Sequence, residues 1–176
     1  ALLCFGATTA SGTFTVTGGV APFTYSVDSN TSGASIVLPA PGPTTSVNFT
    51  NGGAGSVTLQ VQDNSGCTHQ VTINITQPAS AVVITRSPGA TVNLACNGDT
   101  NGTGSFTASG GTGAHTFTVT GNTTGGTTSI VGSVLSFSGA GAGTISVDVR
   151  DVNNCLQTSS ITITAPPALV LTPSAA

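Results

Sequence analysis

The chain has 176 residues, a formal net charge of −3 and only 4% charged side chains, far below the roughly 25% of an ordinary globular domain. Its two cationic side chains exclude the basic surface that binding to nucleic acid requires. A mean hydropathy of +0.32 with 38% hydrophobic residues excludes a charged, disordered tail. Thr, Ser, Asn and Gly interrupt every apolar stretch, so we expect no membrane span.

Apolar residues alternate with Thr, Ser or Asn along short stretches of the chain, and this alternation predicts β-strands with one buried face. Glycine-rich turns separate the stretches, and no part of the sequence has helical periodicity. In chain order, the clearest alternating stretches are residues 14–16, 23–27, 57–61, 71–75, 145–149 and 160–164.

These stretches belong to two copies of one module. Residues 4–19 contain Cys-x-Gly, Gly-Thr-Phe and Gly-Gly in that order, and residues 96–111 repeat the pattern at the same spacing, with Ser in place of Thr. Residues 57–67 likewise recur as residues 145–155, each ending on a cysteine. Six or seven short strands per copy predict an all-β chain of two tandem Ig-like antiparallel β-sandwich domains.

Each module contains two cysteines, and four cysteines allow three pairings. The repeat symmetry favours one bridge within each module, Cys4–Cys67 and Cys96–Cys155. Each bridge would close a loop of roughly 60 residues and stabilise the fold by about 4 kcal/mol. Disulfides are typical of an oxidising setting, so we expect the protein to be extracellular or on a cell surface.

The motifs described above resemble the SprB-like repeats of cell-surface and gliding-motility adhesins of Bacteroidota. The best matches are the Cys96-Asn97-Gly98-Asp99 turn, Gly110-Gly111 and the Asp63-Asn64-Ser65-Gly66-Cys67 loop, and the resemblance extends over both modules. Copy two departs from the family pattern at Ala114 and Asn154, where proline and glycine are expected. The resemblance implies a tandem β-sandwich stalk or adhesin that is exported to the cell surface.

We place module 1 at residues 1–78 and module 2 at residues 79–167, followed by a C-terminal segment at residues 168–176. Module 2 has a strand-like stretch ahead of Cys96, whereas only three residues precede Cys4. Module 1 is therefore expected to lack its own first strand.

The C-terminal segment contains a second copy of that opening strand, Leu169-Val170-Leu171-Thr172. A sheet that lacks an edge strand exposes unpaired backbone groups and invites strand addition. We therefore expect Leu169, Val170, Leu171 and Thr172 to complete the first module of the next copy. Such a head-to-tail contact builds a homopolymer, or joins tandem repeats of one longer polypeptide.

Other chemistry has weaker support in the sequence. His69 and His115 lie at unrelated places in the two copies, and the cysteines lack metal-ligand spacing, so we expect no metal and no cofactor. The stretch at residues 99–103 resembles part of a calcium loop, but a hydrogen-bonded turn explains it better. No nucleophile motif is present, and we expect no enzymatic activity. Candidate N-glycosylation sites are Asn30, Asn48, Asn101 and Asn122.

Two functions compete at this stage. The first is a structural role, in which the chain is a subunit or repeat of an extracellular filament or stalk joined by β-strand complementation. The second is an adhesin module that binds glycans or other cells through its loops. Carbohydrate sites usually present exposed aromatic side chains, and aromatics are only 5% of this chain, mostly at inward strand positions. The sequence therefore favours the structural role.

Overall fold

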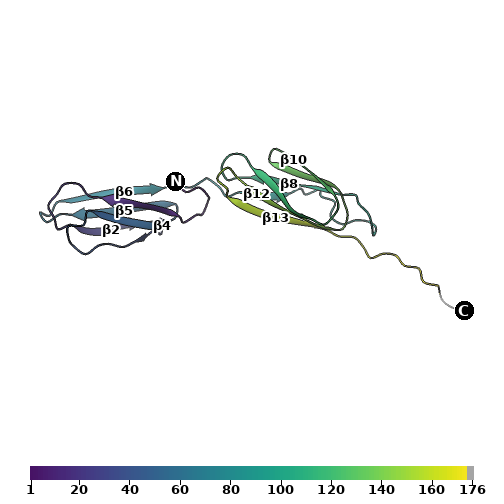
Figure 1. Cartoon of the computed structure of the whole chain (residues 1–176), viewed down its shortest axis with the longest axis horizontal. Coiled ribbons are helices and arrows are strands. Elements are labelled where there is room, and N and C mark those ends of the chain that lie inside the picture. The colour runs from purple at the N-terminus through teal and green to yellow at the C-terminus, as the bar shows by residue number, and fades with distance from the viewer. Residues whose placement is uncertain (174–176) are drawn as a thin grey trace. The chain divides into compact units, whose positions relative to one another are not determined.

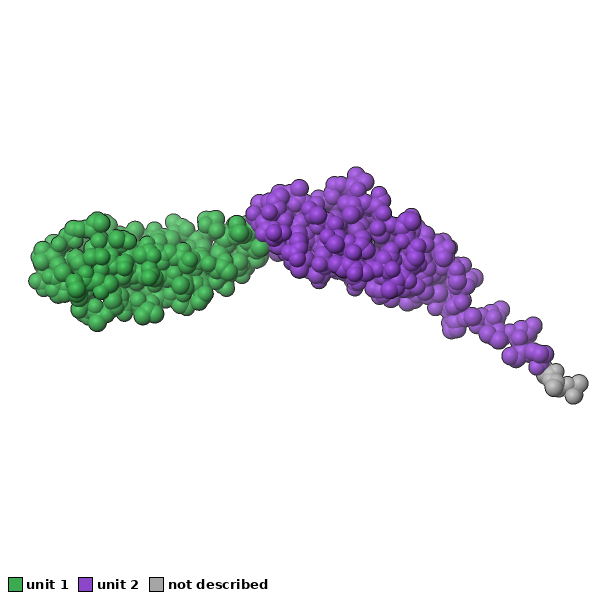
Figure 2. All heavy atoms as spheres, in the orientation of Figure 1, with its two compact units in different colours: residues 1–79 green, residues 80–176 purple. Residues whose placement is uncertain are grey.

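The structure, a computed structural model, describes residues 1–173. The chain divides into two compact units, Ala1–Ala79 and Ser80–Ala176 (Figure 2). The described residues form strands and turns and contain no helix, which confirms the all-β prediction (Figure 1).

Unit 1 consists of two antiparallel sheets of three strands, in the orders β1-β4-β3 and β2-β5-β6. Neighbouring strands in each sheet are antiparallel, and β5 pairs with β6 over its whole length. The strands are β1 (Ala10–Thr15), β2 (Thr24–Asn30), β3 (Ser35–Ile36), β4 (Ser46–Gly52), β5 (Gly55–Gln62) and β6 (Thr68–Ile75).

Unit 2 repeats this plan with one additional strand. Its sheets have the orders β10-β11-β8-β7 and β13-β12-β9. The strands are β7 (Val83–Arg86), β8 (Gly102–Ser109), β9 (Thr116–Asn122), β10 (Thr127–Val131), β11 (Val134–Ala140), β12 (Gly143–Arg150) and β13 (Leu156–Ile163). From the sequence repeat, β8 to β13 correspond in order to β1 to β6, and β7 is the additional strand.

The alternating apolar residues form one core in each unit, and both sheets contribute to it. In unit 1, Phe14 of β1 and Phe49 of β4 pack with their ring centroids 5.9 Å apart against Leu59 of the other sheet. The corresponding rings in unit 2 are Phe106 and Phe137, 6.3 Å apart. Each unit is therefore a sandwich of two sheets whose inward faces carry the residues that the alternation selects.

The Gly-x-Phe motif has a packing reason. A Cβ atom on Gly12 would lie 2.6 Å from the Phe49 ring, and one on Gly104 would lie 2.6 Å from the Phe137 ring. These distances are far shorter than a van der Waals contact. Only glycine leaves room for the aromatic ring of the neighbouring strand at this position.

The prediction of one disulfide within each module is wrong. Cys67 and Cys96 are free and exposed, whereas Cys4 and Cys155 are disulfide-bonded. The bridges Cys4–Cys67 and Cys96–Cys155 are therefore absent from the structure.

The length of the last strand in each unit explains this error. In unit 1 the Leu2 N–H donates to the Thr76 carbonyl at 2.6 Å, so Cys4 lies near the end of β6. Cys67 directly precedes the first residue of that strand. Eight strand residues span about 26 Å, at about 3.3 Å per residue, whereas bridged Cα atoms lie within about 7 Å.

Unit 2 has the same geometry. The Leu94 N–H donates to the Thr164 carbonyl at 2.8 Å, which places Cys96 near the end of β13, while Cys155 directly precedes that eight-residue strand. The repeat symmetry thus paired cysteines that lie at opposite ends of one sandwich.

Candidate functional site

Unit 1 has an open, largely apolar groove beside the edge strand β1. Its larger part has a volume of about 430 Å³ and lies between β1 and the other sheet. A smaller hollow of about 150 Å³ shares Val16, Thr17, Val61 and His69 with it and extends to the Gly18-Gly19 turn and Cys67. We call the two parts together the unit 1 groove. The larger part is lined by Phe14, Thr15, Val16, Thr17, Tyr25, Leu59, Val61, His69 and Val71.

In unit 2 a strand lies at the corresponding place. There β7 pairs antiparallel with β8, and Ile84 lies opposite Ala108, the residue that corresponds to Val16. Val82, just ahead of β7, is only 5% exposed and belongs to the core of unit 2, while Ile84 packs against that core. Among residues 1–79, all of which the structure describes, no strand takes this position, so β1 remains an edge.

The absence of this cover is visible in the burial of individual side chains. Val149 is fully buried in unit 2, whereas its counterpart Val61 is only half-buried in unit 1. Val71 lines the groove and is 46% exposed. Unit 1 thus leaves apolar surface open to solvent, and burying it in a partner would be favourable.

Two equivalent glycines with the same backbone conformation have different surroundings in the two units. Gly110 in unit 2 has φ of 73°, and a Cβ atom there would lie only 2.0 Å from the carbonyl oxygen of Ala81. Its counterpart Gly18 has φ of 77°, and a Cβ atom there would meet nothing within 4 Å. The Gly111 N–H also donates to the Ser80 carbonyl at 3.1 Å. The Gly-Gly turn therefore contacts the incoming strand in unit 2 and is open in unit 1.

Tyr25 lies on the wall of the unit 1 groove and is the only tyrosine of a chain without tryptophan. Its hydroxyl donates a hydrogen bond to the Thr44 carbonyl at 2.6 Å, and the residue is 7% exposed. Burial raises the pKa of the Tyr25 phenol above its ordinary value. The spectroscopic signals of this side chain therefore report on the groove alone.

Asp63 organises the loop at the Cys67 end of the groove. Its carboxylate accepts hydrogen bonds from the N–H groups of Cys67 at 2.9 Å, Val20 at 3.1 Å and Ser65 at 2.9 Å. These bonds, that from Cys67 foremost, hold the pKa of Asp63 below its ordinary value, because each favours the charged form. The Asp63 carboxylate thus stabilises the loop by accepting three backbone N–H groups.

Asp151 has the same role in unit 2. It is 5% exposed, and its burial raises the pKa. The N–H groups of Cys155, Thr112 and Asn153, and then the nearby His115, act in the opposite direction, and the net result is a lowered pKa. The equivalence of the two loops shows that these aspartates serve the fold.

The C-terminal segment, the strand donor expected from the sequence, lies outside every strand. Leu169, Val170 and Leu171 are 101%, 72% and 96% exposed, and Thr172 is also exposed. Figure 1 shows the chain leaving the end of β13 as an extended segment. The remainder of the segment at residues 174–176 lies outside the described residues. An exposed run of three large apolar residues has no stabilising role within its own unit.

The four candidate glycosylation sites are all exposed, and their side chains are engaged to different degrees. Asn30 and Asn122 each bridge a turn, donating to the carbonyls of Ala34 at 2.7 Å and Gly126 at 2.9 Å. Asn48 accepts a hydrogen bond from the Thr13 hydroxyl at 2.7 Å. The side chains of Asn30 and Asn122 thus have a structural role in their loops, and glycosylation of any of the four, including Asn101, stays a prediction.

The stretch that resembles part of a calcium loop is a turn. The Asp99 carboxylate accepts the N–H of Cys96 at 2.9 Å, which closes the turn on itself. Within residues 1–173 no three acidic, histidine or cysteine side chains come together as metal ligands would.

Comparison with known proteins gives one family match. Residues 2–32 match the SprB repeat. The segment includes the Cys-x-Gly, Gly-x-Phe and Gly-Gly motifs and ends just after β2, so the resemblance seen in the sequence is confirmed for this part of unit 1. No curated protein matches the chain.

Several solved structures share a remote likeness. The human desmocollin-1 ectodomain has 10% identity over 89% of this chain and 32% of its own, with a TM-score of 0.45. The eight N-terminal Ig domains of Down syndrome cell adhesion molecule have 14% identity over 90% and 22%, with a TM-score of 0.47. Protocadherin gamma B7 domains 1–4 have 14% identity over 82% and 40%, with a TM-score of 0.43.

The chain therefore spans well under half the length of each of these neighbours, and such low similarity carries no functional argument. Among the described residues, none belongs to a helix long and apolar enough to cross a membrane.

Proposed function

We propose that the chain is a subunit or repeat of an extracellular filament or stalk, built from Ig-like modules that are joined head to tail by strand complementation. In this assembly, Leu169–Thr172 of one copy lie in the unit 1 groove of the next, along the free edge of β1. The partner is a second copy of the same sequence, either as a separate subunit or as the preceding repeat of one polypeptide.

The observation that carries this proposal is the strand at the equivalent place in unit 2. There β7 covers the surface that unit 1 leaves open, and the C-terminal segment resembles β7 and its preceding residue in sequence. With Leu169-Val170-Leu171-Thr172 placed on Val82-Val83-Ile84-Thr85, both leucines take inward positions. The residues on which they are placed alternate in the same way, because Val82 is buried at 5% exposure and Val83 is 46% exposed.

Backbone pairing and apolar burial together explain why such a contact would be specific. The edge of β1 offers N–H and C=O groups to an incoming strand, and the groove receives alternate side chains. The donor and acceptor surfaces are different parts of the chain, so the contact is heterologous and propagates from copy to copy. A net charge of only −3 offers little electrostatic repulsion between copies.

The SprB repeat at residues 2–32 and the oxidised cysteines support a location outside the cell. A glycan-binding role has less support, because seven of the eight aromatic side chains are buried and only Phe5, at 48%, is exposed. Among residues 1–173, Phe5 is therefore the one exposed aromatic side chain on which a sugar ring could stack.

The proposal is tested by closing the groove with one methyl group. Gly18→Ala would place a Cβ atom where unit 2 has the incoming backbone at 2.0 Å, so we expect the variant to fold and to remain monomeric. Gly33→Ala is the matched control, since Gly33 has φ of 69° and the same open surroundings but lies outside the groove. Sedimentation and negative-stain microscopy should then show fibres for the wild type and for Gly33→Ala.

Val71→Asp is a second variant that does not rely on glycine. It puts a charge into the groove at a side chain that is already 46% exposed, and Val37→Asp, at 84% exposure, is its control. Fibres formed equally well by Gly18→Ala and Val71→Asp, or a wild-type chain that stays monomeric at every concentration and binds a glycan instead, would overturn the proposal. A reducing, denaturing gel of native material separates subunits of about 17.0 kDa from one long polypeptide.

A further inference from the structure

The four cysteines occupy two kinds of site, and each unit has one cysteine of each kind. Cys4 and Cys96 are turn cysteines, whose carbonyl oxygens each accept an N–H three residues further on, from Ala7 and Asp99, at 3.3 Å. Cys67 and Cys155 are loop cysteines, whose N–H groups each donate to the aspartate that begins the loop, at 2.9 Å.

The two units differ in which kind of cysteine is oxidised. One turn cysteine, Cys4, and one loop cysteine, Cys155, are disulfide-bonded. The free pair again consists of one cysteine of each kind, the turn cysteine Cys96 and the loop cysteine Cys67, and both are exposed. A second copy of the chain would therefore supply the missing counterpart for each free thiol.

We propose that Cys96 of one copy and Cys67 of the next copy form a disulfide that locks the head-to-tail joint covalently. The inference rests on the proposed strand complementation, because that docking is what brings the two thiols to the same place. The bond would add a covalent link, which only a reductant breaks, to a contact that is otherwise reversible.

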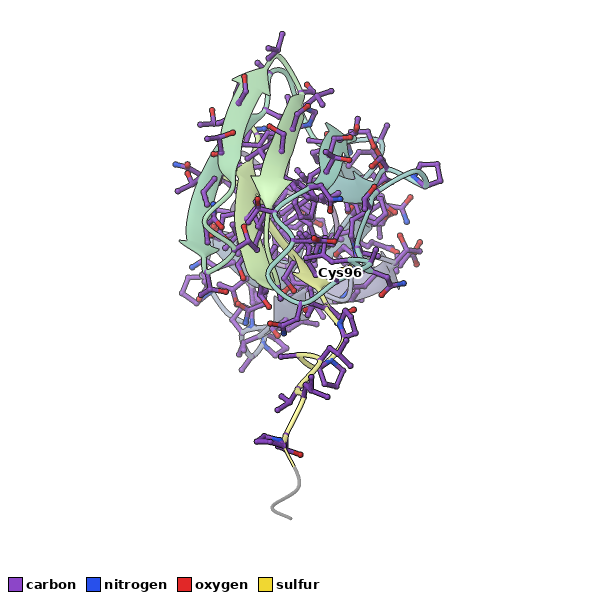
Figure 3. All side chains as sticks on the ribbon, turned by 90° about the vertical axis from the view of Figure 1, so that its right-hand side faces the viewer. Cys96 is labelled. Atoms are coloured by element: carbon purple, nitrogen blue, oxygen red, sulfur yellow. The ribbon has the colours of Figure 1, made fainter. Side chains whose placement is uncertain are left out.

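The donor side of the joint carries Cys96. The Asn97 side chain donates to the Pro166 carbonyl at 3.1 Å, so the turn that contains Cys96 is fixed at the root of the C-terminal segment. Figure 3, which views the chain from the end where this segment leaves, shows Cys96 near its start. With Leu169 placed on Val82, Pro167 takes the place of Ser80, and it directly follows Pro166, about 4 Å away in extended chain.

The acceptor side of the joint carries Cys67. In unit 2 the Ser80 carbonyl accepts the N–H of Gly111, whose counterpart in unit 1 is Gly19. A Cβ atom on Gly19 would lie 3.4 Å from the Cβ of Asp63, and the Asp63 carboxylate holds the Cys67 N–H. Docking of Pro167 at Gly19 would therefore place Cys96 and Cys67 on the two sides of one junction.

The chemistry is thiol–disulfide exchange with a disulfide-bearing oxidant. One cysteine thiolate attacks the oxidant and forms a mixed disulfide, releasing a thiol. The second thiolate then displaces the remaining oxidant sulfur. The two cysteines lose two protons and two electrons in total, and the oxidant disulfide is reduced to two thiols. Oxidised glutathione serves as the oxidant in the experiment.

The test uses Cys67→Ser and Cys96→Ser in the full chain with oxidised glutathione, followed by non-reducing gels. We expect the wild type to form a ladder of covalent multimers that collapses on reduction. Each single variant alone should run as a monomer on the denaturing, non-reducing gel, because it can form no covalent link to another copy. An equimolar mixture of the two variants should give a covalent dimer and nothing larger, because it contains one Cys96 and one Cys67 that can react. Mass spectrometry of the dimer should show these two cysteines linked.

Dimers formed by Cys67→Ser alone would show Cys96 pairing with itself and would overturn the inference. A wild-type chain that gives no ladder while it forms fibres would do so too. The double variant with both serines separates the two proposals. If it still forms fibres that dissolve in denaturing detergent, strand complementation stands independently of the disulfide. If it forms no fibres while Gly33→Ala does, the disulfide alone holds the copies together.

Discussion

Truncating the donor strand should weaken assembly in an alternating pattern. Leu169 is 101% exposed in the free chain, and its counterpart Val82 is 5% exposed in unit 2, so docking would bury the leucine side chain almost completely. Leu169→Ala removes three carbon atoms, which costs about 2.4 kcal/mol of transfer free energy at about 0.8 kcal/mol per buried methylene. The dissociation constant of the joint should therefore rise roughly 60-fold.

Val170→Ala is the matched control on the other face of the same strand. Its counterpart Val83 stays 46% exposed in unit 2, so only part of the smaller side chain is buried, and we expect a change of less than about 5-fold. Sedimentation equilibrium in the Cys67→Ser, Cys96→Ser background measures the constant without covalent links. Equal effects of the two substitutions, or a larger effect of Val170→Ala, would refute the inward placement of Leu169.

Two further predictions concern the modules themselves. Gly104→Ala should lower the thermal stability of unit 2 by about 1–3 kcal/mol, because the new Cβ atom would lie 2.6 Å from the Phe137 ring; Gly89→Ala, with open space around it, should not. The pKa values of Asp63 and Asp151 lie below the ordinary 3.8, so their contribution to stability is present above about pH 4 and is lost as the pH falls through the folded values. Urea unfolding at neutral and acidic pH should therefore show a smaller loss on acidification for the Asp63→Asn, Asp151→Asn double variant, and an unchanged loss would contradict the assignment.

The sequence predicted the strands well because alternation is a local property. Residues 57–61 and 145–149 lie within β5 and β12, and their apolar members point into the cores. The sequence repeat supported the prediction of two similar domains. The Gly-x-Phe motif occurs once in each unit, at residues 12–14 and 104–106, and its glycine makes the same contact with a phenylalanine ring in both. Composition and period were enough to predict the class of fold.

The disulfide pairing failed because repeat symmetry shows which residues are equivalent but says nothing about distance. Cys4 and Cys67 belong to one module, and the length of β6 keeps them apart. The sequence did show that an eight-residue strand follows Cys67, but the pairing of Leu2 with Thr76, which places Cys4 at the far end of that strand, required the structure. The groove itself could be expected only as a missing strand. Its volume, the Gly18-Gly19 turn at one end and the position of Tyr25 on its wall are known only from the structure.

Self-complementation would test the groove from the opposite direction. A chimaera that replaces residues 1–3 by a copy of residues 79–95 gives module 1 the strand that module 2 already has. Val82 and Ile84 of the added copy would be buried in the groove, and each contributes about 1.5–3 kcal/mol when fully buried, so unit 1 should unfold at a higher temperature. The pKa of Tyr25 should rise further, because the added strand covers the groove wall beside it.

The chimaera should also lose the ability to form fibres, because its acceptor site is already occupied within its own chain. The control carries Ser at the copied positions of Val82 and Ile84, which keeps the length of the chain and removes the apolar face of the strand. This control should assemble like the wild type. A chimaera that is stabilised and yet still forms fibres would show that the groove accepts the strand but that copies join elsewhere. A chimaera with an unchanged Tyr25 titration would show that the groove does not accept the strand at all.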